Sequence, residues 1–270
     1  MGAKADDARV LEVGCRRDVP PDERREGSPT VFLHAFPLDS RMWGPVADEL
    51  GRRGIVSLGF DYPGFGATPP WPDDPPSIDA IGDAAVEAMA RQGLSSAYWV
   101  GCSMGGYVAL SICERHPDAV AGLGLVDTRS GADDEDRRRA RHENADETER
   151  LERLANPREW AEPLIGVQGE ERSGIVDMVA GMVASAAPSA VAWAQRAMAA
   201  RPDRTSVLRR LGRPAVIVWG ERDTVSGLDE AEVMGEALGI PVVRIPRAGH
   251  LSPVEAPSAV ADVLVRLYSG

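Results

Sequence analysis

The fold of this chain is decided by the segment Gly101-Cys102-Ser103-Met104-Gly105-Gly106, which joins a short apolar run to a longer apolar run with helical character. A serine on so tight a strand-to-helix turn presents its hydroxyl above the edge of a sheet. Glycines on both sides let the serine take an unfavourable backbone angle, because they bring no Cβ atom into the turn. The pattern predicts that Ser103 is a nucleophile. The alternatives are a glycine-rich turn with an incidental serine, and attack by Cys102, one residue from the apex.

Outward from this turn, short apolar runs alternate with stretches of helical spacing. The predicted strands are Thr30–His34, Ile55–Phe60, Ala97–Gly101, Ala121–Val126, Ala215–Trp219 and Val242–Ile245, with Val10–Val13 as a weaker antiparallel edge. The predicted helices are Met42–Leu50, Ile78–Gln92, Met104–Arg115, Asp229–Leu238 and Ser258–Leu267. The central runs are apolar at consecutive positions, as strands covered on both faces should be. The chain is therefore predicted to be an α/β protein with a mostly parallel central sheet and helices on both faces.

One long segment interrupts this alternation. Residues 128–203 contain no convincing strand; they begin with the charged run Asp133–Arg141 and continue as amphipathic pieces. Ligands of open α/β sheets bind outside the carboxyl ends of the strands, where this segment emerges. We therefore expect a core of residues 1–127 and 204–270, with residues 128–203 inserted as a helical cap. The alternative is a separate helical module.

Composition excludes several classes of partner. The formal net charge of −12 repels phosphate backbones and anionic lipids, so neither nucleic acid nor membrane is expected as a partner. Three cysteines make no framework of disulfides, and no Cys/His cluster has metal-ligand spacing, so no metal is expected. The charged start resembles no secretory signal and no long apolar run occurs, so the expected location is cytoplasmic. No signal for an oligomeric state is visible.

A serine hydroxyl needs an adjacent base, and the chain has four histidines. His116 lies where the helix after the turn stops, and His142 lies in the charged run. His34 ends a strand and is better placed to brace the loop that follows. His250 comes after the last predicted strand, on a glycine-containing loop that could bring its ring over Ser103. His250 is therefore the predicted base.

The base in turn needs a carboxylate that holds its tautomer and stabilises the imidazolium. Asp223 follows the predicted strand Ala215–Trp219 and lies between the serine and the histidine in sequence. Asp127, at the end of the strand before the insertion, is the alternative. Glu221 and Asp229 are interpreted as solvated charges at a helix entry. The predicted catalytic set is Ser103, His250 and Asp223.

Five ordered motifs resemble the α/β-hydrolase superfamily, in its branch of small capped esterases, enol-lactonases and cofactor-free haloperoxidases. They are His34-Ala35-Phe36-Pro37, Asp61-Tyr62-Pro63-Gly64-Phe65-Gly66, the Ser103 turn, Gly220-Glu221-Arg222-Asp223 and Gly249-His250. One oxyanion donor should be the N–H of Met104, the residue after the nucleophile. The resemblance implies that the other is the N–H of Phe36, although Ala35 stands where the family usually has glycine. It also implies structural support from the Asp61 turn, and no cofactor.

The expected reaction is hydrolysis of a carboxylic ester with a small to medium apolar acyl group, through an acyl-serine. Candidates for the substrate pocket are His34 and four cap residues, with loop bracing or cap packing as the alternatives: Trp160, Met178, Met182 and Trp193. Enol-lactone hydrolysis, carbon–carbon bond hydrolysis and perhydrolysis use the same triad and stay open. The family's dehalogenases and epoxide hydrolases carry aspartate where Ser103 stands, so both are disfavoured. A second class, a non-catalytic receptor on the same fold, is disfavoured because all three triad positions are present.

Overall fold

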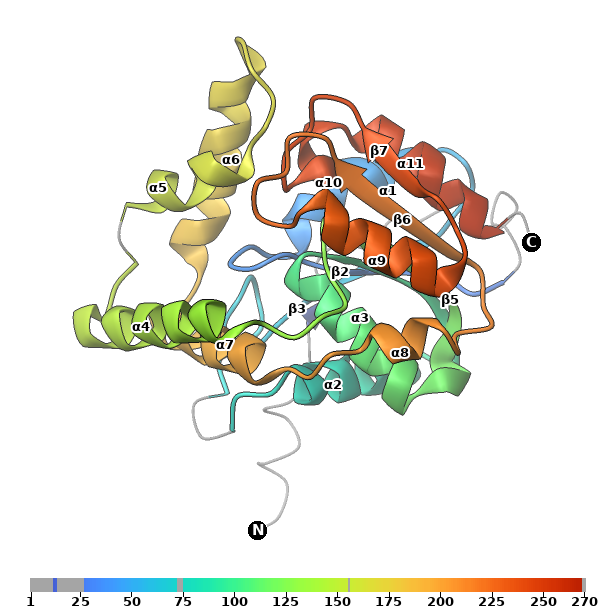
Figure 1. The fold of residues 1–270 in the computed structure, drawn as a ribbon, viewed down its shortest axis with the longest axis horizontal. Coiled ribbons are helices and arrows are strands. Elements are labelled where there is room, and N and C mark those ends of the chain that lie inside the picture. Colours follow the sequence, from blue (N-terminus) through green and yellow to red (C-terminus); the bar gives the residue numbers. More distant parts are fainter. Residues whose placement is uncertain (1–11, 14–26, 72–74, 155, 269–270) are drawn as a thin grey trace.

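The structure is a computed structural model that describes residues 12–13, 27–71, 75–154 and 156–268. Within these residues one sheet has the strand order β1-β3-β2-β4-β5-β6-β7 (Figure 1). The strands are β1 Glu12–Val13, β2 Thr30–Leu33, β3 Ser57–Asp61, β4 Ala97–Cys102, β5 Val120–Val126, β6 Ala215–Gly220 and β7 Val242–Ile245. β1 pairs antiparallel with β3, and all other neighbours are parallel. The predicted α/β class with a mostly parallel sheet is confirmed.

The strand predictions differ from the structure only at their ends. The strand predicted from Ile55 begins at Ser57, because the N–H of Ile55 still bonds to Leu50 in the turn after a helix. Of the predicted edge Val10–Val13, the residues of β1 are a strand and the others lie outside the described residues.

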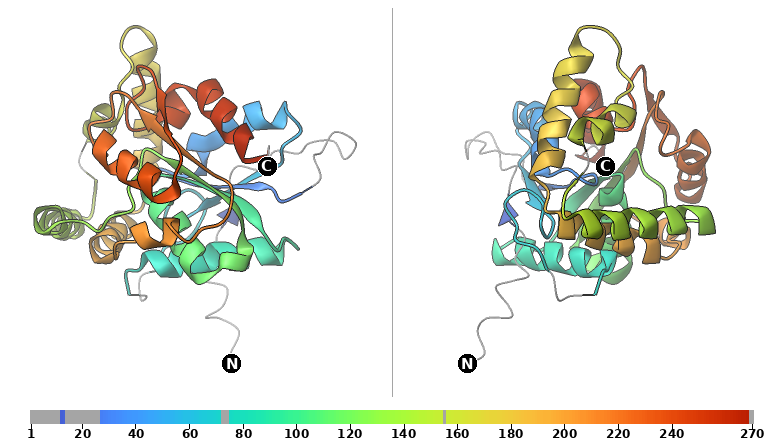
Figure 2. Two further views of the ribbon diagram at one scale, coloured as in Figure 1. Left: turned by 45° about the vertical axis from the view of Figure 1, so that its right-hand side comes forward. Right: turned by 90° about the vertical axis from the view of Figure 1, so that its left-hand side faces the viewer.

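Helices cover both faces of the sheet (Figures 1 and 2). The helices of the core are α1 Gly44–Gly51, α2 Ile78–Arg91, α3 Met104–Arg115, α8 Thr205–Leu208, α9 Leu228–Leu238, α10 Ser252–Glu255 and α11 Pro257–Leu264, with short 3-10 helices Ser40–Trp43, Pro117–Ala119 and Val265–Tyr268. Alternate strand side chains enter two cores: Phe32 and Val100 pack with α1 and α11, and Leu33 and Trp99 pack with α2 and α3. Burial on both faces explains the consecutive apolar positions of these strands.

Between β5 and β6 the chain forms helices and, in its described part, no strand. Before α8 these are α4 Glu135–Leu151, α5 Pro157–Ala161, the 3-10 helix Glu162–Leu164, α6 Glu171–Ser185 and α7 Pro188–Ala200. The charged run thus begins α4, whose first turn is capped by the Asp134 side chain, an acceptor for the N–H of Arg137. The segment stands beside the sheet, with α4 along α7 (Figure 2). α6 joins the core of α1 and α11, whereas α7 joins that of α2 and α3.

No single helix in the described ranges is long and apolar enough to cross a membrane. Helices α6 and α7 meet that test of length and composition only when taken together, across a bend of 97°.

Candidate active site

Ser103 sits on a strained turn between β4 and α3, at the centre of the sheet. Its backbone has φ 52° and ψ −116°, a conformation that residues with a Cβ atom rarely adopt. The two flanking glycines make the turn possible: a Cβ atom on Gly101 would lie 2.1 Å from the carbonyl oxygen of Gly105, and one on Gly105 would lie 2.1 Å from that of Leu33. The glycines therefore prevent collisions with backbone, as the sequence predicted.

His250 and Asp223 complete a continuous chain of hydrogen bonds with this serine. The Ser103 Oγ lies 2.8 Å from His250 Nε2, and His250 Nδ1 lies 2.9 Å from Asp223 Oδ2. With the carboxylate charged, Nδ1–H donates to Asp223 and Nε2 is free to accept the serine proton. His250 and Asp223 are 4% and 8% exposed, so water does little to weaken these bonds.

The Asp223 carboxylate is held in its charged form. Burial alone would raise its pKa, but the hydrogen bond and charge of His250, with donors from Ser226 and Val225, outweigh burial and keep the pKa below its usual range. The Ser226 hydroxyl donates to Oδ2 at 2.5 Å, and the N–H groups of Val225 and Ser226 donate to Oδ1 at 2.8 and 3.0 Å. Four donors therefore fix this carboxylate against the imidazole.

Asp127, the alternative acid, has different partners. It is fully buried at the end of β5, and its two oxygens accept the N–H groups of Gly220 at 2.8 Å and Ser252 at 3.0 Å. Burial and the charge of Asp223 raise its pKa well above the usual range, against these two donors. Asp127 thus ties the last residue of β6 to the first residue of α10, and Asp223 is the acid that meets the imidazole.

The alternative nucleophile, Cys102, and the three other histidines are not part of the hydrogen-bond chain of Ser103, His250 and Asp223. Cys102 is fully buried, and burial raises the pKa of its thiol well above the usual range, so a thiolate is disfavoured there. His116 pairs with Asp83 at 2.7 Å, and His142 is exposed on α4. His34 is fully buried, where its ring stacks on Tyr62 and accepts the N–H of the same residue at 3.1 Å. It therefore braces the loop after β2.

The two predicted oxyanion donors flank the serine. Met104 is the first residue of α3, so its N–H has no acceptor within the helix. Phe36 lies in the loop after β2, and both it and Ser103 line the same cavity. The Phe36–Pro37 peptide bond is cis. Both assignments stay predictions about how charge on the substrate oxygen is stabilised.

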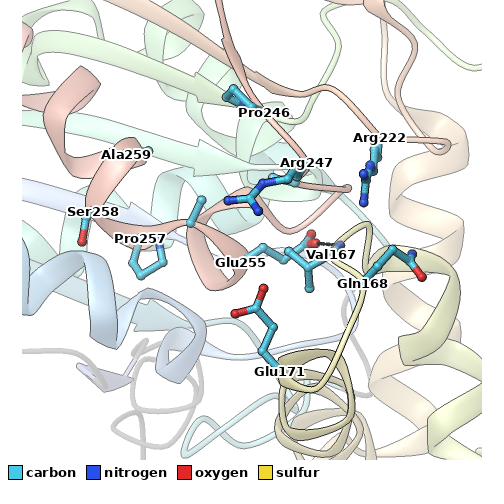
Figure 3. A pocket seen from close by; sticks show the side chains of 12 residues that line it. Val167, Gln168, Glu171, Arg222, Pro246, Arg247, Glu255, Pro257, Ser258 and Ala259 are labelled. Carbon is cyan, nitrogen blue, oxygen red and sulfur yellow. Dashed lines mark hydrogen bonds between the residues drawn. The ribbon is translucent and has the colours of Figure 1, made fainter.

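A half-buried carboxylate that sequence reasoning did not find, Glu255, anchors the loop that carries His250. Figure 3 shows this side chain bonded to Val167. Glu255 Oε1 accepts the N–H of Gly249 at 2.9 Å, and Oε2 accepts those of Gly166 and Val167 at 2.7 and 2.8 Å. The N–H of His250 also bonds to the carbonyl of Leu164. The segment after the 3-10 helix Glu162–Leu164 is therefore fastened to the loop that carries the imidazole. Only contacts between distant segments reveal this role.

A cavity of about 190 Å³ opens beside the serine. Of the five predicted pocket residues only Trp160 lines it; its ring meets that of Phe36 edge-on, with centroids 6.1 Å apart. His34 is covered, Met178 is 43% exposed on α6, Met182 is buried in the α1–α11 core, and Trp193 packs against Trp71. The structure places these four side chains outside this cavity.

The cavity wall also contains residues that the sequence did not single out. They are Tyr107, Arg129, Arg141, Leu164, Met198 and Val225. Arg129 lies two residues beyond Asp127 at the end of β5, which is a signal that could have found it. Arg141 ends the charged run Asp133–Arg141, and only the position of α4 brings it to the cavity.

Comparisons with known proteins identify the family. A family model described as "Alpha/beta hydrolase family" matches residues 30–263. The chain belongs to the alpha/beta hydrolase family. It is therefore an enzyme of this superfamily, and the superfamily resemblance seen in its motifs is confirmed.

The hydrolase also resembles individual members of the family. It is 31% identical over 253 residues to 2-succinyl-6-hydroxy-2,4-cyclohexadiene-1-carboxylate synthase from Enterobacter sp. (strain 638), covering 88% of this chain and 90% of the relative. A thermophilic esterase from Thermogutta terrifontis, in a malate-bound form, matches with a TM-score of 0.85 and 30% identity over 96% of this chain and 93% of that one. The enol-lactonase from Burkholderia xenovorans LB400 matches with a TM-score of 0.81 over 96% and 97% of the two chains; its 20% identity shows the shared fold alone.

Proposed function

We propose that this hydrolase cleaves carboxylic esters of small to medium acyl groups through an acyl-serine intermediate. The observation that carries the proposal is the unbroken chain from Ser103 Oγ through His250 to Asp223, with links of 2.8 and 2.9 Å. A serine, an imidazole and a carboxylate so arranged can generate a nucleophile near neutral pH. The similarity to an esterase along almost the whole chain supports the same reaction.

The mechanism has two steps. In the first, His250 Nε2 takes the proton of Ser103 as its oxygen attacks the acyl carbon, and returns a proton to the departing alcohol. In the second, His250 takes a proton from water, which attacks the acyl-serine and releases the acid. Asp223 holds the Nδ1 proton and stabilises the imidazolium in both steps. The N–H groups of Met104 and Phe36 stabilise charge on the acyl oxygen, at about 3–4 kcal/mol for one donor.

Residues 128–203 act as the cap of this site. Trp160 on α5 and Leu164 beyond it form part of the cavity wall. The bond from the His250 N–H to Leu164 couples the cap to the base. The cap thus limits the acyl group and excludes water from part of the site.

A second reaction on the same triad remains a candidate, because the Enterobacter relative is a synthase and not an esterase. Enol-lactone hydrolysis is the nearest alternative, followed by carbon–carbon bond hydrolysis and perhydrolysis. The substrate is a small-molecule ester in ester hydrolysis and a small-molecule lactone in enol-lactone hydrolysis.

Hydrolysis of 4-nitrophenyl acetate and butyrate tests the proposal. We expect turnover that Ser103→Ala reduces by about 10⁴-fold or more. Cys102→Ala is the matched control, and should retain activity. Turnover that survives in the Ser103→Ala protein would refute the assignment.

A further inference from the structure

The cavity beside Ser103 is not uniformly apolar, since two arginines stand in its wall with the serine and the base. Arg129 is 5% exposed as a residue and follows β5; Arg141 is on α4 of the cap. Arginine is almost never buried without a partner, so the hydrogen-bond partners of these two side chains decide what they can bind.

The first arginine is only partly satisfied. Arg129 Nη1 donates to Glu230 at 2.8 Å, and Nη2 donates to the carbonyl of Val225 at 2.8 Å. Its Nε–H is buried and has no hydrogen-bond partner among the described residues. A buried guanidinium donor without an acceptor is costly, and the charge of this side chain stands in the cavity wall.

The second arginine has a donor to spare. Arg141 Nε donates to Asp133 at 2.5 Å, and Nη1 contacts Gln195 at 3.0 Å and the sulfur of Met198 at 3.4 Å. Its Nη2 forms no hydrogen bond within the part of the chain that the structure describes, and its side chain is 20% exposed. The free end of a guanidinium suits a carboxylate, which can accept two of its N–H groups at once.

In the ion pairs around the two arginines, guanidinium groups outnumber carboxylates. Glu230 is shared between Arg129 and Arg137. Asp133 is shared between Arg141 and Arg201. Four guanidinium groups therefore face two carboxylates, in a chain whose net charge is −12.

A further positive charge, on Arg201, lies against a residue of the cavity wall. The Arg201 guanidinium lies 3.9 Å from the ring centroid of Tyr107, and Tyr107 lines the cavity. The pKa of Asp133 agrees: burial would raise it, but Arg201 and Arg141 hold it down at about 2. A cleft with low-dielectric walls concentrates such a field on any ligand that enters.

We propose that Arg141 and Arg129 form a carboxylate-binding subsite, so that the substrate is an ester or lactone whose acyl group carries a second, free carboxylate. This inference rests on the proposed function and names its substrate class. The acyl chain lies against Phe36, Trp160 and Leu164, and its far end meets the arginines. Ser103 attacks the ester carbon as before, and the free carboxylate takes no part in bond making or breaking.

Matched esters test the subsite. Mono-(4-nitrophenyl) glutarate and 4-nitrophenyl valerate have the same acyl chain length and leaving group and differ in the terminal carboxylate. We expect kcat/KM at least about 10-fold higher for the glutarate ester, since charge-assisted hydrogen bonds favour it. Arg141→Gln should lower kcat/KM for the glutarate ester by about 10- to 100-fold and for the valerate ester by less than about 3-fold. Asp133 keeps Arg201 as a partner in this variant, so the fold should survive.

The control variant is Arg139→Gln, which removes the same charge from α4 at a side chain that is 61% exposed and paired with Asp136. It should leave both esters unchanged. Arg129→Gln is a second test, because Glu230 keeps Arg137. Equal rates for the two esters in the wild type, or equal losses for both esters in Arg141→Gln, would overturn the subsite while ester hydrolysis stands.

Binding of glutarate itself separates the two proposals. Calorimetric titration of the wild-type protein with glutarate should show binding that Arg141→Gln weakens by about 10-fold or more and Arg139→Gln does not. If neither ester is hydrolysed, ester hydrolysis fails, and this titration still decides the subsite. Absence of glutarate binding, or binding that Arg141→Gln leaves unchanged, would refute it.

Discussion

Two buried aspartates end neighbouring strands at the same edge of the sheet, and they have different roles. Asp223, after β6, meets the imidazole of His250 at 2.9 Å. Both oxygens of Asp127, after β5, accept backbone N–H groups instead, from Gly220 at the end of β6 and from Ser252 at the start of α10. Position at a strand end therefore brings a carboxylate to the site, but its hydrogen-bond partners decide whether it works on the base or on the scaffold.

The pKa values of the two aspartates are shifted in opposite directions. The imidazole and three further donors hold the pKa of Asp223 below its usual range. Burial and the nearby charge of Asp223 raise the pKa of Asp127, against the opposing hydrogen bonds from Ser252 and Gly220. A buried carboxylate is thus kept charged where an imidazolium forms beside it.

The largest effect should come from the acid that meets the imidazole. Asp223→Asn removes the charge that stabilises the imidazolium, so kcat for 4-nitrophenyl butyrate should fall by about 10³- to 10⁴-fold. Circular dichroism should report an unchanged fold. If Asp127→Asn loses as much kcat and Asp223→Asn little, the roles of the two aspartates are reversed.

The scaffold acid should affect stability more than rate. Asp127→Asn offers a single acceptor to two N–H groups, so one buried donor loses its partner and the free energy of unfolding should fall by about 1–3 kcal/mol. Its kcat should change by less than about 10-fold. Urea unfolding and steady-state kinetics measure both, with the exposed Asp118→Asn as control.

Glu255 tests whether a second scaffold carboxylate behaves like Asp127. It takes N–H groups from the cap and from the His250 loop. Glu255→Gln should lower kcat about 3- to 10-fold through a less well-held imidazole, with a loss of stability of about 1–2 kcal/mol. Glu171 is exposed and lines the same surface pocket as Glu255, so Glu171→Gln should change neither kcat nor stability. Unchanged kcat and stability in Glu255→Gln would show that the hydrogen bonds of Glu255 are dispensable.

The smallest effects are opposite trends with pH. The pKa of Asp223 is lowered, so its stabilisation is present above about pH 4 and lost as pH falls through the folded-state value. The pKa of Asp127 is raised, so its charging costs stability as pH rises above about 4. The free energy of unfolding that Asp223→Asn loses relative to wild type should therefore grow with pH. The loss in Asp127→Asn should shrink with pH. Urea midpoints between about pH 3 and 8 measure both; parallel trends would contradict the division.

Much of the site could be predicted from local sequence patterns. The apolar strand before Ser103 and the glycines around it are neighbours in sequence, so the turn could be predicted from local chemistry. Asp223 and His250 could be placed because each follows a strand of a parallel sheet, and such strands end at one edge. The remaining choice between Asp127 and Asp223 depends on hydrogen bonds between loops, which no local pattern records.

The segment between β5 and β6 shows where local patterns fail. Met182 and Trp193 were candidates for the pocket because they are large and apolar, but such residues also fill the contacts between cap helices and core. Arg141 lies in a charged run typical of a solvated helix face, yet the packing of α4 on α7 turns it to the cavity. Which helix face meets the site is set by tertiary packing, and periodicity alone does not specify it.

The most direct test of the catalytic chain is labelling with a fluorophosphonate probe, followed by mapping of the modified peptide. We predict that the wild-type protein is labelled rapidly on Ser103, that Asp127→Asn is labelled at a similar rate, and that Asp223→Asn is labelled far more slowly. Label on another residue, or no label on intact wild-type protein, would contradict the assignment of Ser103, His250 and Asp223.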